Sequence, residues 1–271
     1  MNEKTMNKEL PKISEDNKKY KFTDDYITVE KINGETHTLY RIRATKDIIS
    51  ESGEVIARKG DLGGFIEKES NLDYLSNAWV SGNAIVFGDA RVSGHAVVTG
   101  NDAWVFDHAQ VSGHARVSGR ATISGHAQVS GHAIVSGYAG VSGNAKVYDY
   151  AIVSGRAVVG GRATIFGDAE VFGEAFVAGY AKVFGYAMVF GNAWVYEYAG
   201  VAGNAKVYNY AIVSGYARVS GEAEVFDKAK VSGYAGVAGN AMVFGHAEVS
   251  NGKWTDGHIT EENCVKKAKR P

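Results

Sequence analysis

Hydrophobic and small residues recur with a period of six through residues 74–250, in the unit Val-x-Gly-x-Ala-x. Position one of this unit is Val or Ile from Val80 to Val243, and position five is Ala from Ala78 to Ala247. Side chains alternate along a strand, so positions five and one point inward, whereas positions six and two point outward. A strict period of this kind is typical of a solenoid, in which each repeat buries its apolar side against its neighbours.

Three strands per turn give a coil of 18 residues, so residues 18 apart lie above one another. The pattern predicts an all-β fold, a parallel β-helix of about ten coils whose narrow interior holds only Val, Ile and Ala. Glycine at position three suits a corner with positive φ. Other residues at this position include Asp107, Asp149, Asn209, Asp227 and Glu197. Asp and Asn tolerate this conformation, but the residue type gives no reason for Glu197. Residues 98–104 have seven positions where six are expected, which predicts a bulge at a corner.

Both ends of the chain leave the repeat. The polar first residues predict a disordered leader, and a β-rich region after it predicts a small N-terminal cap. The expected organisation is therefore a leader (1–18), the N-terminal cap (19–73), the repeats (74–250) and a C-terminal cap (251–271). A solenoid exposes strand edges at both ends, and the two caps are expected to cover them.

Within the N-terminal cap, Asn33-Gly34 is a hairpin signal between the β-rich runs 26–29 and 38–42. Residues 54–57 form a further candidate strand. The glycine-rich segment 59–67 is similar to a phosphate-binding loop, but no Gly-Lys-Ser/Thr follows it. We therefore expect a turn that carries the chain onto the first coil.

At the other end, Thr260-Glu261-Glu262-Asn263 is typical of a helix start, and the basic residues up to Arg270 suit a helix C-terminus. The sequence predicts a short C-terminal helix, with Trp254 anchoring the cap.

The composition narrows the classes of partner. A formal net charge of -1 gives no reason to expect nucleic-acid binding, and no apolar run approaches the length of a membrane span. A single cysteine, Cys264, excludes an internal disulfide framework and fits a reducing compartment. The polar N-terminus contains no secretory segment. We expect no cofactor, and a location in the cytoplasm of a bacterium or of a phage-infected host cell.

Histidines are the candidate chemical groups. His95, His114 and His132 lie on one corner in successive coils and are the candidates for a transition-metal site. His108 and His126 lie on another corner. A straight column offers poor tetrahedral geometry, and the same repeat position also holds Asn, Tyr, Arg, Glu or Asp, so these histidines are interpreted as turn residues. No Ser-His-Asp order, Cys-His pair or Cys-x-x-Cys is present, so the sequence assigns no catalytic residue.

The outward positions carry columns of aromatic and apolar side chains. Three columns are candidates for an interface: Phe172, Phe190, Tyr208, Phe226 and Phe244 on one face; Val158, Phe176, Trp194 and Ile212 on the next face; and Tyr180, Tyr198, Tyr216 and Tyr234 on one corner. Contiguous apolar patches usually mark an interaction surface. The alternative is that stacking of like side chains only stiffens the rod. The segment 139–148 recurs almost unchanged at 199–208, a spacing of 60 that moves the copy to another face.

Units of the form aliphatic-x-x-x-small-x resemble the left-handed parallel β-helix of the hexapeptide-repeat superfamily, known mostly from acyltransferases. The segment Gly63-Gly64-Phe65-Ile66-Glu67-Lys68-Glu69-Ser70-Asn71-Leu72, followed by Asn77-Ala78-Trp79-Val80, more narrowly resembles the YdcK-like hexapeptide-repeat proteins of bacteria and their phages. The resemblance implies a left-handed coil and leaves the activity open. The acyltransferases carry a long loop out of one coil and a catalytic histidine near the coenzyme A groove, and this chain has no such loop.

Three functions are consistent with the sequence. The first is a non-enzymatic scaffold that self-associates, as a trimer by likeness to the superfamily or as a dimer, or that binds a protein partner through its aromatic faces. The second is an acyltransferase that uses acyl-CoA between subunits, against which the missing loop argues. The third is a phage-type factor that sequesters a host protein or a small ligand. Nothing in the sequence separates the first from the third.

Overall fold

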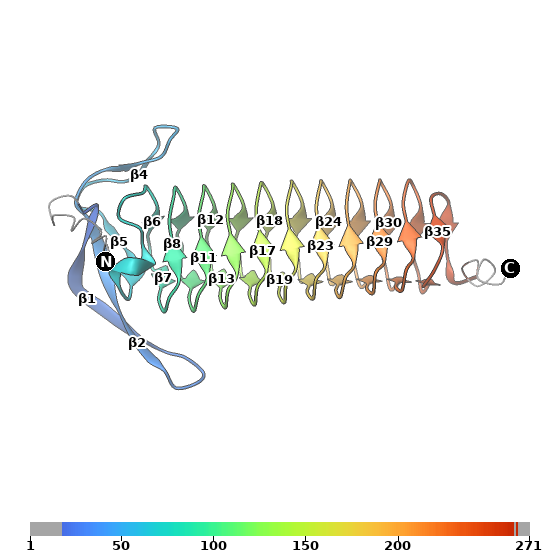
Figure 1. The fold of residues 1–271 in the computed structure, drawn as a ribbon, viewed down its shortest axis with the longest axis horizontal. Coiled ribbons are helices and arrows are strands. Elements are labelled where there is room, and N and C mark those ends of the chain that lie inside the picture. Colours follow the sequence, from blue (N-terminus) through green and yellow to red (C-terminus); the bar gives the residue numbers. More distant parts are fainter. Residues whose placement is uncertain (1–17, 263, 265–271) are drawn as a thin grey trace, which may run out of the picture.

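The computed structural model describes residues 18–262 and 264, which form an antiparallel cap and a long three-sided parallel solenoid (Figure 1). This described part is built of strands, with one short 3₁₀ helix, η2 (Glu69–Asn71). The predicted all-β solenoid is therefore confirmed. None of the described residues belongs to a helix long and apolar enough to cross a membrane.

Three parallel sheets form the sides of the solenoid. The first sheet stacks β5 (Leu62–Ile66), β7 (Ile85–Val86), β10 (Trp104–Val105), β13 (Thr122–Ile123), β16 (Gly140–Val141), β19 (Val158–Val159), β22 (Phe176–Val177), β25 (Trp194–Val195), β28 (Ile212–Val213), β31 (Lys230–Val231) and β34 (Glu248–Val249). The second sheet stacks β8 (Arg91–Val92), β11 (Gln110–Val111), β14 (Gln128–Val129), β17 (Lys146–Val147), β20 (Thr164–Ile165), β23 (Lys182–Val183), β26 (Gly200–Val201), β29 (Arg218–Val219), β32 (Gly236–Val237) and β35 (Lys253–Trp254). The third sheet stacks β6 (Trp79–Val80), β9 (Val97–Val98), β12 (Arg116–Val117), β15 (Ile134–Val135), β18 (Ile152–Val153), β21 (Glu170–Val171), β24 (Met188–Val189), β27 (Lys206–Val207), β30 (Glu224–Val225), β33 (Met242–Val243) and β36 (His258–Ile259).

Within each sheet, paired residues are separated by the predicted 18-residue turn of the coil. Trp104 pairs with Thr122, and Thr122 pairs with Gly140. The extra residue appears between β7 and β10, where Trp104 pairs with Ile85. Gly100 has φ 126 at that corner. The predicted bulge is confirmed, and the coils beyond it return to the regular spacing.

The interior of the solenoid is apolar. Side chains at positions one and five, such as Val159 and Ala163, are 0 % exposed. The backbone holds the coils together, because each strand donates hydrogen bonds to carbonyls one coil further on; Lys146 N, for example, donates to Ala163 O at 2.9 Å. The predicted inward positions are therefore confirmed, and the interior is a packed core rather than a tunnel.

The corners have left-handed backbone, as predicted: φ is 68 at Gly143 and 60 at Glu197. The acidic exceptions share a contact that the sequence did not reveal. Glu197 Oε2 accepts a hydrogen bond from Gly215 N at 2.6 Å, and Asp149 Oδ2 accepts one from Gly167 N at 3.2 Å. An acid at this position therefore binds the backbone of the next corner, which gives Glu197 its physical reason.

The N-terminal cap begins with the predicted hairpin, in which β1 (Tyr20–Glu30) and β2 (Thr36–Ala44) pair around Asn33-Gly34. The next strand of this sheet, β5, pairs antiparallel with β2 and parallel with β7. It therefore joins the cap to the solenoid, within the segment 59–67 that the sequence predicts to be a turn. The solenoid starts at Leu62, earlier than the hexapeptide pattern indicates.

A second hairpin, called the arm below, consists of β3 (Ile48–Ile49), residues 50–54 and β4 (Val55–Ala57). The predicted strand at 54–57 is thus present as β4. The arm projects from the cap on the side opposite the tip of the β1–β2 hairpin and reaches over the first coils (Figure 1).

The C-terminal end of the solenoid extends beyond the expected boundary at residue 250. Lys253 in β35 pairs with Gly236, and His258 in β36 pairs with Met242, so the last turn is shorter than the others. The coil has about 11 turns in place of the predicted ten. Trp254 is buried in it, as expected of an anchor.

The predicted C-terminal helix falls largely on residues 263 and 265–271, which lie outside the described residues, as do residues 1–17 of the predicted leader. One hydrogen bond with helical spacing, from Cys264 N to Thr260 O at 3.1 Å, is present at its start.

Candidate functional site

The aromatic column on the third sheet is a continuous stack of rings. It consists of Phe172, Phe190, Tyr208, Phe226 and Phe244, whose neighbouring rings lie 4.9–5.2 Å apart with interplanar angles of 2–8°. Each ring is half-buried because the next ring covers its face. The Tyr208 hydroxyl donates to Glu224 Oε2 at 3.0 Å, and burial together with this bond raises the pKa of Tyr208 to about 12. The facing rings of this column therefore contact one another.

The first sheet carries a more open surface, called the uncharged strip below. It consists of position six (Thr122, Gly140, Val158, Phe176, Trp194 and Ile212) and position two (Ser124, Ser142, Gly160, Ala178, Tyr196 and Ser214) of six coils. None of these side chains bears a charge. Trp194 is 51 % exposed and Val158 is 40 % exposed. The strip therefore presents a partly apolar face to solvent.

The same face is covered at its N-terminal end. There the β1–β2 hairpin supplies Leu39 to a buried cluster with Phe65, Ile85 and Phe87, against which Trp104 and Phe106 pack. The hairpin is fastened at its tip by an ion pair of 2.7 Å between Lys31 Nζ and Asp107 Oδ1. In this chain an aromatic stretch of the first sheet is thus already covered by another segment.

The tyrosine column lies on the corner between the first and second sheets. Its members Tyr180, Tyr198, Tyr216 and Tyr234 stack 4.9–5.2 Å apart and are 45–74 % exposed. Beside it, the second sheet forms a groove of about 890 Å³ that includes Arg162, Lys182 and Arg218 in its lining. This groove is basic and aromatic, in contrast to the uncharged strip.

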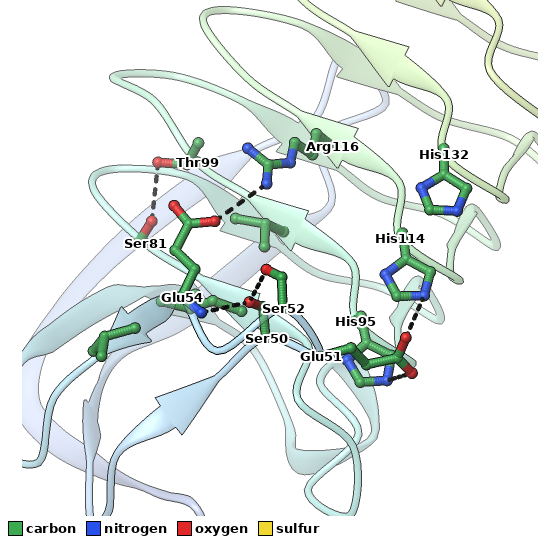
Figure 2. A pocket seen from close by; sticks show the side chains of 13 residues that line it. Ser50, Glu51, Ser52, Glu54, Ser81, His95, Thr99, His114, Arg116 and His132 are labelled. Carbon is green, nitrogen blue, oxygen red and sulfur yellow. Dashed lines mark hydrogen bonds and ion pairs between the residues drawn. The ribbon is translucent and has the colours of Figure 1, made fainter.

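The histidines meet the arm in a second pocket, of about 530 Å³ (Figure 2). The rings of His95, His114 and His132 stack at centroid distances of 4.8 and 4.7 Å, and Tyr150 continues the column at 4.8 Å. Glu51, at the end of the arm, places its carboxylate 3.0 Å from His95 Nε2 and 3.4 Å from His114 Nε2. His132 contributes its ring to the wall and lies one coil further from Glu51.

The rest of the pocket is polar. Ser50 Oγ and Ser52 Oγ lie 2.9 Å apart in the arm, and Ser81 Oγ donates to Thr99 Oγ1 at 2.9 Å on the coil. Further along, the Arg116 guanidinium lies 3.6 Å from the Glu54 carboxylate. Figure 2 shows the Ser50–Ser52 pair between these groups on the coil and the Glu51 carboxylate.

The second histidine pair lies on a corner away from the arm. His108 and His126 stack at 4.6 Å, and His108 Nδ1 lies 3.5 Å from Asp89. Asp89 is also held by Lys68 Nζ at 2.8 Å. The sequence found both columns of histidines, but it missed Glu51, because the position of the arm over the coils leaves no pattern in the repeat.

The repeat also identifies the family. A family model described as YdcK Beta solenoid repeat matches residues 78–94, 109–125 and 127–143. The chain is a YdcK β-solenoid repeat protein. The narrower resemblance seen in the sequence is thus confirmed, and the matched YdcK repeats lie on the coils that carry the histidines. No curated protein matches this chain.

Proposed function

We propose that this YdcK repeat protein is a non-enzymatic scaffold that self-associates through the uncharged strip. The observation that carries the proposal is that one aromatic region of the first sheet is covered and another is exposed. The chain covers Phe87 with its own hairpin, whereas Trp194 on the same sheet is left 51 % exposed. Exposed apolar surface of this kind is typical of an interface.

The side chains of one half of the strip are larger than those of the other half. This difference favours a second copy of the chain as the partner that covers the strip. Phe176, Trp194 and Ile212 occupy position six in the half nearer the C-terminus, and Thr122 and Gly140 occupy it in the other half. In a two-fold dimer with antiparallel rods, the bulky half of one copy lies on the small half of the other. The small side chains allow the two sheets to approach to the roughly 10 Å of packed sheets.

Of the two assemblies expected from the sequence, this complementarity favours the dimer over the trimer. A surface that pairs with itself closes after two copies, and no strip is left for a third. The Trp194 side chain would then lie against small residues near the middle of the interface, where truncation of a large aromatic residue has its greatest effect on affinity.

The test is light scattering at about 50 µM, a concentration at which a Kd of about 1 µM gives mostly dimer. Gly140→Arg places a long cation in the small half of the strip. A Cβ at Gly140 meets no atom within 4 Å, so the coil itself tolerates the change. The control is Gly200→Arg, at the same repeat position on the second sheet, where the nearest atom is 4.0 Å away.

We expect light scattering to give twice the mass of one chain for wild type and Gly200→Arg. It should give the mass of one chain for Gly140→Arg and Trp194→Glu. Circular dichroism should be the same for all four proteins, since the substituted positions point outward. A monomeric wild type, or a dimer that survives both Gly140→Arg and Trp194→Glu, refutes this use of the strip.

We propose the handedness of the coil and the location of the protein from the resemblance and from the composition. The likeness to the hexapeptide superfamily supports a left-handed coil. The absence of a disulfide framework from a sequence with one cysteine supports a location in the cytoplasm of a bacterium or of a phage-infected cell.

A further inference from the structure

We propose that Glu51, His95 and His114 bind one divalent transition-metal ion, with zinc as the best match, and that this ion fastens the arm to the solenoid. The site is independent of the dimer proposed above. It lies on the corner between the second and third sheets, whereas the uncharged strip lies on the first sheet.

The three ligand atoms are already close together. One ring nitrogen of His95, one ring nitrogen of His114 and one carboxylate oxygen of Glu51 all lie within 4.8 Å of one another. Two ligands at a tetrahedral metal, each about 2.1 Å away, are roughly 3.4 Å apart. A bound ion would require rotations of the side chains that close this difference, and the 64 % exposure of the Glu51 side chain at the end of the arm leaves room for its rotation.

Glu51 supplies what a column of histidines lacks. Stacked rings place their nitrogens in one line, and a line alone does not surround an ion. The carboxylate comes from a different segment and contacts both imidazoles from the side (Figure 2). Two imidazoles and one carboxylate are a ligand set that zinc accepts, with a fourth position for water.

The ion would change how firmly the arm is held. The base of the arm is already held by Ile48 and Ala57, which are buried in the core cluster, and by Ile56, which packs against it. Nearer its end, the described polar contacts with the coils are a hydrogen bond of 2.9 Å from Asn77 Nδ2 to Ile49 O and the exposed Arg116–Glu54 pair at 3.6 Å. Exposed ion pairs contribute at most about 1 kcal/mol. A metal bound only when the arm is closed stabilises the closed arm by mass action.

The other stacked pair provides the comparison. His108 and His126 stack in the same way, but Asp89 lies near His108 and is held by Lys68, and no arm residue approaches them among the described contacts. If stacked imidazoles alone bound zinc, both corners would bind it. The proposal assigns binding to the corner that faces Glu51.

The experiment is calorimetric titration of the full chain, without an affinity tag, with zinc chloride. We expect one ion per chain with a Kd below about 10 µM. Glu51→Gln and His114→Asn should each weaken binding at least about tenfold. Asparagine occupies the same repeat position at Asn83, Asn144 and Asn204, so His114→Asn keeps the corner. The matched control, His126→Asn, should bind as wild type does.

Hydrogen exchange of residues 48–57 reports the closed arm directly. At a zinc concentration 100 times the Kd, exchange through arm opening should slow by up to about 100-fold in wild type, and should stay unchanged in Glu51→Gln. Absence of zinc binding, binding that survives Glu51→Gln combined with His114→Asn, or binding lost in His126→Asn would each overturn the proposal. Binding without slower exchange in the arm would refute the fastening role.

Discussion

Glu197 tests how a corner of the solenoid is stabilised. Its φ of 60 costs a residue other than glycine about 1–2 kcal/mol. Its carboxylate offsets part of that cost, because Oε2 accepts a hydrogen bond from Gly215 N at 2.6 Å. At an exposed position this bond contributes about 1 kcal/mol.

Two substitutions separate these effects. Glu197→Ala loses the hydrogen bond and keeps the strained backbone, so we expect the free energy of unfolding to fall by about 1 kcal/mol. Glu197→Gly loses the same bond but relieves the strain, so its stability should stay within about 0.5 kcal/mol of wild type. Gly215→Ala is the opposite control. It adds strain at φ 67, and its Cβ would meet Gly233 N at 2.8 Å, so it should be the least stable of the three.

The assay is urea denaturation followed by circular dichroism, with midpoints compared between variants measured in parallel. Repeat proteins often unfold in several steps, so the midpoint of the same transition must be used throughout. Equal losses for Glu197→Ala and Glu197→Gly would show that the corner is not strained. No loss for Glu197→Ala would show that the carboxylate contributes nothing.

Two further predictions concern the core and the cap. Ala163→Leu should destabilise the solenoid by about 1–3 kcal/mol, since its side chain is fully buried, whereas the outward Thr164→Leu should have little effect; equal thermal melts would contradict this. Burial lowers the pKa of Lys19, which donates to the carbonyls of Ser76 and Ala78, to about 7. An unfolded lysine has a pKa of about 10.4, so the unfolded chain binds more protons between these values and stability rises with pH there. Urea denaturation at about pH 7.5 and 9.5 should show that the free energy of unfolding rises more for wild type than for Lys19→Met. An equal change in the two proteins would refute the lowered pKa of Lys19.

The sequence predicts the repeats well because their contacts are local. Each coil packs only on its neighbours, so the residue types at positions one, three and five fix the interior and the corners. The bulge at residues 98–104 is visible for the same reason. Even the exception at Glu197 lies at a predicted corner, although its reason, the bond to Gly215, requires the structure.

The arm and the last turn could not be predicted in this way. Nothing in residues 48–57 indicates which corner of the coil they approach, so Glu51 could not be joined to the histidines. The last turn is hidden because its strands no longer follow the regular spacing: Trp254 pairs with Val237, and Ile259 pairs with Val243. The six-residue pattern is lost where the coil shortens, although apolar side chains still fill the interior.

The duplicated segment shows that the surroundings of a repeat depend on the face it occupies and not on its sequence. Residues 139–148 and 199–208 are almost identical, yet Gly140 lies in the first sheet and Gly200 in the second. The neighbours of Gly140 along its sheet are Thr122 and Val158, whereas those of Gly200 are Lys182 and Arg218. The same local sequence therefore belongs to an uncharged strip in one place and to a basic groove in the other. A change of face is enough to give one unit two surroundings, because the residues 18 apart in the neighbouring coils, and not the unit itself, decide what lies beside it.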